Sequence, residues 1–273
     1  MKIAADFGIT VTDLLRKDKD GNLFHNMQLS SGEVSPEYLK QLFKDLDLNK
    51  EVELIAVTGG RHLSIGEEVE GVSVIHVNEI DAIGEGAMHL SGVDPAKPTI
   101  IISAGSGTAC IFAKDNKFMH CSGTGVGGGT VLGLSKLLIG TSDPLEIEKL
   151  ATKGDESSVD LIIEDVVLGP IGQLPPETTA VNFGKVANSQ NYPSKEDIAA
   201  GIINLVGQTA ARIATSVAMA FQAEDIVVVG RSPSFIGLKK SLEEAALLTG
   251  FKPIFPKNGE YASALGALII ADK

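Results

Sequence analysis

Two glycine-containing turns carry side chains that suit the binding of phosphate and of a cation. Each turn follows a short apolar segment; the first reads Asp6-x-Gly8-x-Thr10 and the second reads Gly105-Ser106-Gly107-Thr108. A glycine lets the backbone approach an anion, and an aspartate can orient Mg²⁺ or its water shell. Either turn alone is also compatible with an ordinary hairpin. Their equivalent positions in the two halves of the chain favour a pair of phosphate-binding turns.

A third stretch, Ser122–Thr130, is richer in glycine than either turn. It contains five glycines within positions 123–129 and runs directly into the apolar segment Val131–Leu138. Backbone N–H groups at the start of a helix form an anion site. The alternative is a flexible linker, but such linkers rarely join a strand to an apolar helix without serine or proline padding. We therefore predict a phosphate-binding helix start here.

Apolar periodicity and turn residues predict the elements that must position these three stretches. The first half is expected to hold strands at 2–7, 11–16, 22–29, 53–60 and 72–77, and helices at about 35–47 and 78–90. The second half is expected to hold strands at 99–103, 225–229 and near 252–255, a hairpin turning at 115–117, and helices at about 131–138, 194–221, 234–248 and from 259. The segment Asp94–Pro98 lies between the halves, so the predicted domains are residues 1–95 and 96–273.

Both halves follow the same plan: a strand, a glycine turn, a strand, a tight turn and a third strand. Two β-β-β-α halves with facing glycine turns are typical of the actin-like ATPases and sugar kinases, which share the ribonuclease H-like fold and bind ATP in the cleft between the halves. We predict an α/β protein of this class. An ordinary doubly wound sheet is the alternative.

The sequence resembles the type II, eukaryotic-like pantothenate kinases across nearly its whole length. The most specific similarity is the run Gly123–Leu134, followed by Leu137-Leu138-x-Gly140. Further matching stretches occur in the same order as in the family: 57–60, 78–82, 105–107, 182–184, 194–197, 226–230 and 261–268. The resemblance implies transfer of the ATP γ-phosphate to the primary hydroxyl of pantothenate, the first step toward coenzyme A. It also implies Mg²⁺ as cofactor, a homodimer, and inhibition by coenzyme A or its thioesters.

The resemblance also assigns roles to individual residues of this chain. Glu79 matches the general base that takes the proton of the attacking hydroxyl. The nucleotide side is implied to comprise Asp6, which would also orient Mg²⁺, and Gly8, Thr10, Gly105, Gly107, Gly125, Gly127, Gly128, Gly129 and Gly230. The acceptor side is implied to comprise Thr58, Gly59, Gly60, Ser106 and His120.

Glu79 also has a purely structural interpretation. Asn78 is placed to cap a helix, Glu79 then lies in its first turn, and Asp81 can return a bond to the cap. An acid at such a helix start stabilises the helix by roughly 0.3–1 kcal/mol. The family match favours the catalytic role for Glu79, while Asp81 keeps the capping role.

Several positions depart from the family pattern at the expected phosphate and acceptor contacts. His120 stands where the family has an arginine, and histidine is mostly neutral at pH 7 and offers fewer donors. In the first turn, Ile9 replaces a glycine and Asp13 replaces a lysine. Smaller departures are Ser103, Arg231 and Ser263. Charge could be supplied from a new direction by Arg61, Arg231 or Lys185.

These departures leave three hypotheses for function. The first is a kinase for pantothenate or a related small alcohol. The second is a catalytically impaired protein that binds nucleotide or coenzyme A and regulates a partner. The third, a sugar kinase of the same fold, is disfavoured because the expected aspartate base in its helix motif is not found.

Composition limits the partners and the compartment. The formal net charge of −12 disfavours nucleic acid and anionic membranes but not a small anionic ligand. No segment has the length of a membrane span, and the first residues enter a strand rather than a signal peptide, so we predict a cytoplasmic protein. Cys110 and Cys121 could meet across a hairpin, but two reduced thiols are the favoured interpretation.

Overall fold

The computed structural model describes residues 1–30, 33–45, 52–167 and 174–273. Its first sheet has six strands in the order β3-β2-β1-β4-β6-β5. Their bounds are β1 (Lys2–Phe7), β2 (Val11–Lys17), β3 (Leu23–Leu29), β4 (Leu54–Gly59), β5 (Glu68–Val69) and β6 (Val72–His76). The first three strands form an antiparallel meander, and β4 joins β1 in parallel. Helix α1 (Pro36–Asp45) covers one face; its predicted end near residue 47 lies outside the described residues.

The second sheet repeats this plan with four strands in the order β12-β7-β8-β9. Their bounds are β7 (Thr99–Ala104), β8 (Thr108–Lys114), β9 (Lys117–Thr124) and β12 (Asp225–Val229). Again three antiparallel strands are joined by a strand parallel to the first of them. The expected duplication of a strand, glycine turn and hairpin is therefore confirmed. The strand expected near residue 252 is present only as a single parallel bridge between Val227 and Ile254, because the short segment pairs at one position.

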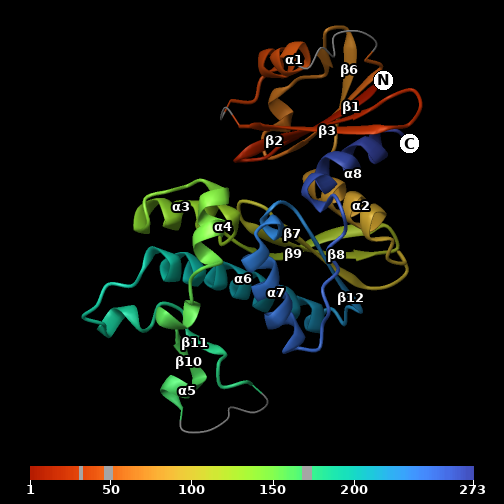
Figure 1. The fold of residues 1–273 in the computed structure, drawn as a ribbon. Helices are drawn as coiled ribbons and strands as arrows, with labels where there is room; N and C mark the ends of the chain where they lie inside the picture. Colours follow the sequence, from red (N-terminus) through yellow and green to blue (C-terminus); the bar gives the residue numbers. More distant parts are fainter. Residues whose placement is uncertain (31–32, 46–51, 168–173) are drawn as a thin grey trace.

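Two helices lie between the sheets, as Figure 1 shows, and each packs on the sheet of the other half. Helix α2 (Glu79–Ser91) follows the first sheet in the chain, yet its Ile83 and Ala87 pack against the second sheet. Helix α8 (Ala262–Ala271) ends the chain, yet its Leu265 belongs to the core of the first sheet. This exchange of helices ties the two halves of the chain together.

Helices α2 and α8 touch through glycine. A Cβ added to Gly266 would overlap the carbonyl oxygen of Ala82, and one added to Gly86 would overlap that of Ala262. Only glycine at both positions lets the two backbones come this close.

We expect Gly266→Ala to destabilise the protein by about 3 kcal/mol or more, since the helices must separate or shift. Urea unfolding followed by circular dichroism measures this loss. The matched control is Gly133→Ala in helix α3 (Gly128–Leu138), where an added Cβ meets nothing within 4 Å. That change should be neutral or stabilising by about 0.5–1 kcal/mol. Equal stability of the two variants would contradict the proposed close packing.

Helices α6 (Lys195–Ala220) and α7 (Ile236–Leu247) cover the outer face of the second sheet. Helices α3 and α4 (Pro144–Ala151) pack against α6. A smaller unit holds β10 (Leu161–Ile162), α5 (Ile163–Val166) and β11 (Thr179–Val181). Buried Asp160 fastens this unit to α6, since it accepts hydrogen bonds from the Phe183 N–H at 2.7 Å and from Asn204 Nδ2 at 3.0 Å. The stretch 182–184 thus has a structural role in this chain.

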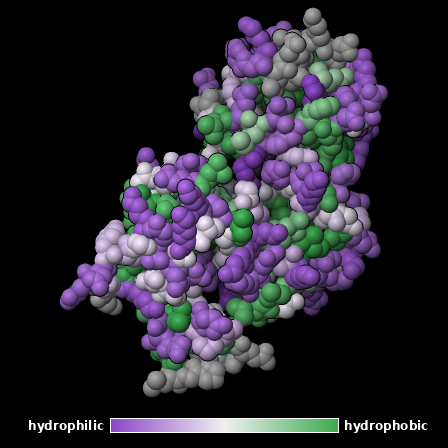
Figure 2. Space-filling model, in the orientation of Figure 1, coloured by the Kyte–Doolittle hydropathy of each residue, from purple (hydrophilic) through white to green (hydrophobic). Residues whose placement is uncertain are grey.

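Among the described helices, none combines the length and apolar character needed to cross a membrane. Figure 2 shows that hydrophilic residues cover much of one face of the molecule, with smaller hydrophobic groups between them. Cys110 is buried and Cys121 half-buried, and the two are not joined in a disulfide in the structure. Burial, and then the neighbouring Cys121, raises the pKa of Cys110 to about 11, as suits an unreactive core thiol.

Candidate functional site

The two predicted phosphate turns face each other in the structure. The first joins β1 to β2, and the second joins β7 to β8. Thr10 Oγ1 and Ser106 Oγ lie 2.6 Å apart, a hydrogen bond between the two halves of the chain. Ile9, at the tip of the first turn, is 87% exposed. The branched side chain of Ile9 is therefore largely in contact with solvent.

Glycine is required in the first turn and beside it. A Cβ on Gly8 would lie 2.7 Å from the carbonyl oxygen of Val11, so the reversal between β1 and β2 excludes any side chain there. Gly59, at the end of the adjacent strand β4, has a φ of +92°. A Cβ on Gly59 would lie 2.6 Å from Asp6 Oδ1. Gly8 thus allows the tight reversal of the chain, and Gly59 allows close packing against the carboxylate of Asp6.

The glycine run packs directly against the second turn. The N–H groups of Gly128 and Gly129 donate to the carbonyl oxygens of Gly105 and Ser106, at 2.8 and 2.9 Å. A Cβ on Gly127 would lie 2.7 Å from the Cα of Gly107. The run and the second turn therefore form one layer, and two of the N–H groups predicted to meet phosphate are engaged within it.

Helix α3 begins earlier than expected, at Gly128 rather than Val131. The N–H of Gly127 donates to Thr130 Oγ1 at 3.1 Å, which caps the first turn. This capping hydrogen bond outweighs the low helix propensity of glycine. At Gly125, by contrast, an added Cβ would meet nothing within 4 Å. Gly125 is therefore the glycine of the run with open space beside it.

The end of β12 completes this layer. Gly230 has a φ of +94°, and a Cβ there would lie 2.6 Å from the carbonyl oxygen of Ala104. Ser232 Oγ donates to the carbonyl oxygen of Gly105 at 2.8 Å. A cavity of about 370 Å³ opens beside Gly230, with Lys239 and Phe255 in its lining. This cavity adjoins the position expected for the adenosine side.

Three carboxylates lie close enough to interact at the end of β1. Burial raises the pKa of Asp6 to about 7, and the negative charges of Asp13 and Glu79 add to the effect. A hydrogen bond from Ser263 and the positive charge of Arg231 oppose it. Such a carboxylate lacks a sufficient counter-charge, which a bound cation would supply.

Glu79 begins helix α2 and is exposed. Asn78 Oδ1 caps the helix by accepting from the N–H of Ile80 at 2.9 Å and of Asp81 at 3.4 Å. The expected return bond from the Asp81 side chain is absent from the described part of the structure, because the exposed Asp81 carboxylate faces solvent instead. The cap is therefore made by Asn78, and the Glu79 carboxylate stays near Asp6.

Asp13 and Arg231 form an ion pair that links the halves. Arg231 Nη2 lies 2.5 Å from Asp13 Oδ1, and His25 Nε2 lies 2.7 Å from the same oxygen. Asp13 is 5% exposed. The charge of Asp13 is therefore balanced by a neighbour. The two departures from the family pattern at Asp13 and Arg231 are therefore partners. The sequence signal for this pairing was that, relative to the family, Asp13 replaces a positive charge by a negative one and Arg231 adds a positive charge.

The other two candidate cations have different surroundings. Lys185 pairs with Asp165 at 2.9 Å and donates to the carbonyl oxygen of Ser157 at 2.8 Å, in the smaller unit around β10. Arg61 directly precedes the short 3₁₀ turn His62–Ser64. Arg231 pairs with Asp13 of β2, and the next residue, Ser232, bonds to the second turn.

The residues of the predicted acceptor side come from β4 and β9. Thr58 is the register partner of Asp6, and its buried Oγ1 has no hydrogen-bond partner among the described residues. An added Cβ on Gly60 would meet nothing within 4 Å, so the chain is open there. His120 is exposed on β9, with Nε2 close to Gly123. The structure thus places Thr58, Gly59 and Ser106 beside the two turns and places His120 on the adjoining strand.

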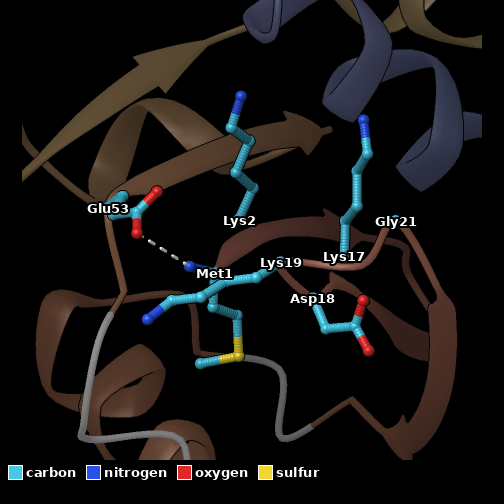
Figure 3. A pocket seen from close by; sticks show the side chains of 7 residues that line it. All are labelled: Met1, Lys2, Lys17, Asp18, Lys19, Gly21 and Glu53. Carbon is cyan, nitrogen blue, oxygen red and sulfur yellow. Dashed lines mark ion pairs between the residues drawn. The ribbon is translucent and has the colours of Figure 1, made fainter.

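A second pocket, of about 340 Å³, lies at the opposite end of β1 from Asp6. Figure 3 shows its lining, in which the Met1 amino group pairs with Glu53 at 3.3 Å. Lys2 and Lys17 both pair with Asp272 of the last helical turn. The pocket lies at the other end of β1 from the two turns and is not part of the predicted phosphate site.

Comparison with known proteins identifies the family of this chain. The family model named Fumble matches residues 12–269. The chain belongs to the Fumble family. A type II pantothenate kinase from Staphylococcus aureus (strain USA300) is 28% identical over 276 residues, which cover 99% of each chain. The predicted membership in the type II pantothenate kinase family, a family of kinase-like phosphotransferases, is confirmed.

Solved structures agree on the fold of this Fumble-family chain. Component A of the (R)-2-hydroxyglutaryl-CoA dehydratase of Acidaminococcus fermentans superposes with a TM-score of 0.67 at 16% identity, covering 99% of this chain and 96% of that one. A ROK family glucokinase from Streptomyces griseus, in complex with glucose and AMPPNP, superposes with a TM-score of 0.64 at 13% identity, covering 99% of both chains. These similarities confirm the expected actin-like ATPase and sugar-kinase fold.

Proposed function

We propose that this protein transfers the γ-phosphate of ATP to the primary hydroxyl of pantothenate, the first step toward coenzyme A. The observation that carries the proposal is the meeting of the two turns at Thr10 and Ser106, beside the carboxylates of Asp6 and Glu79. A nucleotide-bound glucokinase of the same fold and curated relatives named type II pantothenate kinase support it.

Glu79 acts as the general base in this proposal. It is exposed at the start of α2, so a substrate hydroxyl can reach it, and it remains near enough to Asp6 to interact electrostatically. Phosphoryl transfer requires little covalent chemistry from the protein, so positioning of the hydroxyl and stabilisation of charge dominate. Ser106, Thr58, Gly59, Gly60 and His120 would line the acceptor side.

Asp6 would hold Mg²⁺. No group of three or more metal-binding side chains occurs among the residues that the structure describes. Mg²⁺ in kinases typically takes only one or two carboxylates and completes its shell with water and phosphate, so a single aspartate fits. Burial, together with the charges of Asp13 and Glu79, raises the pKa of Asp6, and a bound cation would favour its charged form. The bound ion would neutralise charge on the phosphate oxygens.

The nucleotide would lie along the layer formed by the second turn, the glycine run and the end of β12. Its phosphates would be near Gly8, Thr10, Gly105, Gly107 and the segment Gly125–Gly129. The adenosine would enter the cavity beside Gly230, where Lys239 and Phe255 are in the lining. A cytoplasmic homodimer and inhibition by coenzyme A or its thioesters complete the proposal.

Turnover with purified protein tests this function. With Mg²⁺, ATP and pantothenate we expect ADP release and a product heavier by one phosphoryl group in mass spectrometry. Glucose in place of pantothenate should give no more ADP than ATP alone. Phosphorylated glucose, or no product with any acceptor, would contradict the proposal.

A binding protein without turnover is the second candidate, favoured by one observation. The N–H groups of Gly128 and Gly129 are engaged by the second turn instead of pointing to a ligand. Calorimetry with ATP, ADP and coenzyme A distinguishes the candidates, since a binding protein retains affinity without product formation. Absence of binding to all three compounds would exclude this second candidate.

A further inference from the structure

We propose that Arg231 is the cation that contacts the phosphate groups of the nucleotide, and that Asp13 and His25 are positioning residues that hold its guanidinium between the two turns. The inference rests on the proposed function, because it requires a nucleoside triphosphate bound at these turns. Arg231 belongs to the second half of the chain, whereas Asp13 and His25 belong to the first half.

The backbone places Arg231 beside the second turn. Arg231 directly follows Gly230 at the end of β12, and the next residue, Ser232, bonds to the carbonyl oxygen of Gly105 at 2.8 Å. A Cβ on Gly128 would lie 2.8 Å from Ser232 Oγ. The backbone of Arg231 is thus fixed to the layer that holds the second turn and the glycine run.

The side chain reaches the first turn. Its Nη2 lies 2.5 Å from Oδ1 of Asp13, which is the register partner of Asp6 on the antiparallel strand β2. The positive charge of Arg231 also acts on the Asp6 carboxylate. The guanidinium therefore lies beside the carboxylates of Asp13 and Asp6, next to the first turn.

Asp13 is itself held in place. His25 on β3 bonds to the same Oδ1 at 2.7 Å, and the His25 ring packs on the ring of Tyr261 with centroids 4.5 Å apart. Tyr261 precedes α8, the helix that packs on the first sheet. The chain from Tyr261 through His25 to Asp13 is a packed support for the ion pair with Arg231.

The guanidinium retains donors for a ligand. Arginine has five N–H donors in a planar fork. The side chain of Arg231 is 33% exposed, and its buried Nε has no hydrogen-bond partner in the described part of the chain. Phosphate oxygens match the arginine fork with two parallel bonds. A nucleotide phosphate would accept from the exposed part of this fork.

Calorimetry on Arg231→Gln tests the inference, with Mg-ATP, Mg-ADP and adenosine as probes. We expect the Kd for ATP and ADP to rise by about 10- to 100-fold and the Kd for adenosine to change less than about twofold. Arg231→Lys, which keeps the charge without the fork, should lose less affinity. Arg212→Gln is the matched control, since it removes the same charge from an exposed position on α6.

Asp13→Asn tests the positioning role. We expect it to weaken ATP binding in the wild-type background and to have no effect in the Arg231→Gln background, because Asp13 acts through Arg231. Additive losses, or tighter ATP binding after Asp13→Asn alone, would overturn the positioning role. His25→Gln should follow the same pattern with a smaller loss.

The outcomes separate this inference from the proposed function. If the wild type binds ATP and Arg231→Gln binds it equally well, the inference is wrong and the kinase proposal stands. If the wild type binds neither ATP nor ADP, both fail. Thermal unfolding of each variant establishes that it is folded. If Arg231→Gln does not fold, the Kd values of Arg231→Lys are compared with those of the wild type instead.

Discussion

Replacement of Glu79 by glutamine should lower kcat with pantothenate by on the order of 10²–10⁴ and leave the Kd for ATP within about twofold. The amide has nearly the same shape as the carboxylate but cannot accept the proton of the attacking hydroxyl. Because Glu79 is exposed at the helix start and capping depends on Asn78, stability should change by less than about 1 kcal/mol. Steady-state kinetics with both substrates, together with calorimetry for ATP, measures these effects.

Asp81→Asn is the matched control for this change. Asp81 is exposed and lies in the same first turn of α2, and its replacement by asparagine removes the same negative charge. It should alter kcat by less than about threefold, since a helix-start acid contributes only about 0.3–1 kcal/mol to stability. Equal losses in both variants would assign the effect to the helix start, and unchanged kcat in Glu79→Gln would exclude Glu79 as the base.

Local sequence signals were sufficient for the longer strands of the two large sheets but missed the short strands β5, β10 and β11. The strands at 2–7 and 99–103 were identified because buried strands are short apolar runs, and their glycine turns because a tight reversal excludes a side chain, as at Gly8. The same signals failed near residue 252, where an apolar segment pairs at a single position. Apolar character predicts burial there, but pairing depends on a neighbouring strand distant in the chain.

The contacts between the halves could not be predicted from local sequence. The exchange of α2 and α8 depends on Gly86 and Gly266, which read as ordinary helix-weakening glycines until their partners are known. Likewise, Asp13 and Arg231 are 218 positions apart. Considered alone, Asp13 brings a negative charge close to the expected phosphates, and Arg231 is a departure from the family pattern. Together they form an ion pair in which the two charges balance.

The role of the glycine run was predicted only in part. Its place at a helix start follows from sequence, because the glycine run and an apolar segment adjoin. The engagement of the Gly128 and Gly129 N–H groups by Gly105 and Ser106 does not, since it arises from packing two loops together. A run rich in glycine can therefore serve close packing of backbones as well as contact with an anion.

Replacement of Asp6 by asparagine should have opposite effects on activity and stability. The amide removes the charge proposed to hold Mg²⁺, so kcat/KM for ATP should fall by on the order of 10²–10³. The same change removes a carboxylate whose ionisation is opposed by burial and by Asp13 and Glu79, so the free energy of unfolding should rise at neutral pH. Activity assays and urea unfolding without Mg²⁺ measure the two effects separately.

The pH dependence of this gain follows from the raised pKa of Asp6, from 3.8 to about 7. Between these values the unfolded chain has lost the proton that the folded chain retains, so wild-type stability falls as pH rises and levels off above about pH 7. Asparagine does not titrate. The stability advantage of Asp6→Asn should therefore be near zero at about pH 4 and grow to its full value near pH 7.

The expected advantage is about 2 kcal/mol. The full shift corresponds to about 4 kcal/mol at about 1.4 kcal/mol per pKa unit, and we halve it because the half-buried side chain is partly screened by solvent. Added Mg²⁺ should stabilise the wild type more than Asp6→Asn, since only the wild type offers the carboxylate. A gain independent of pH between 4 and 7 would show that Asp6 ionises freely in the folded protein, and would remove the electrostatic argument for a cation at this site.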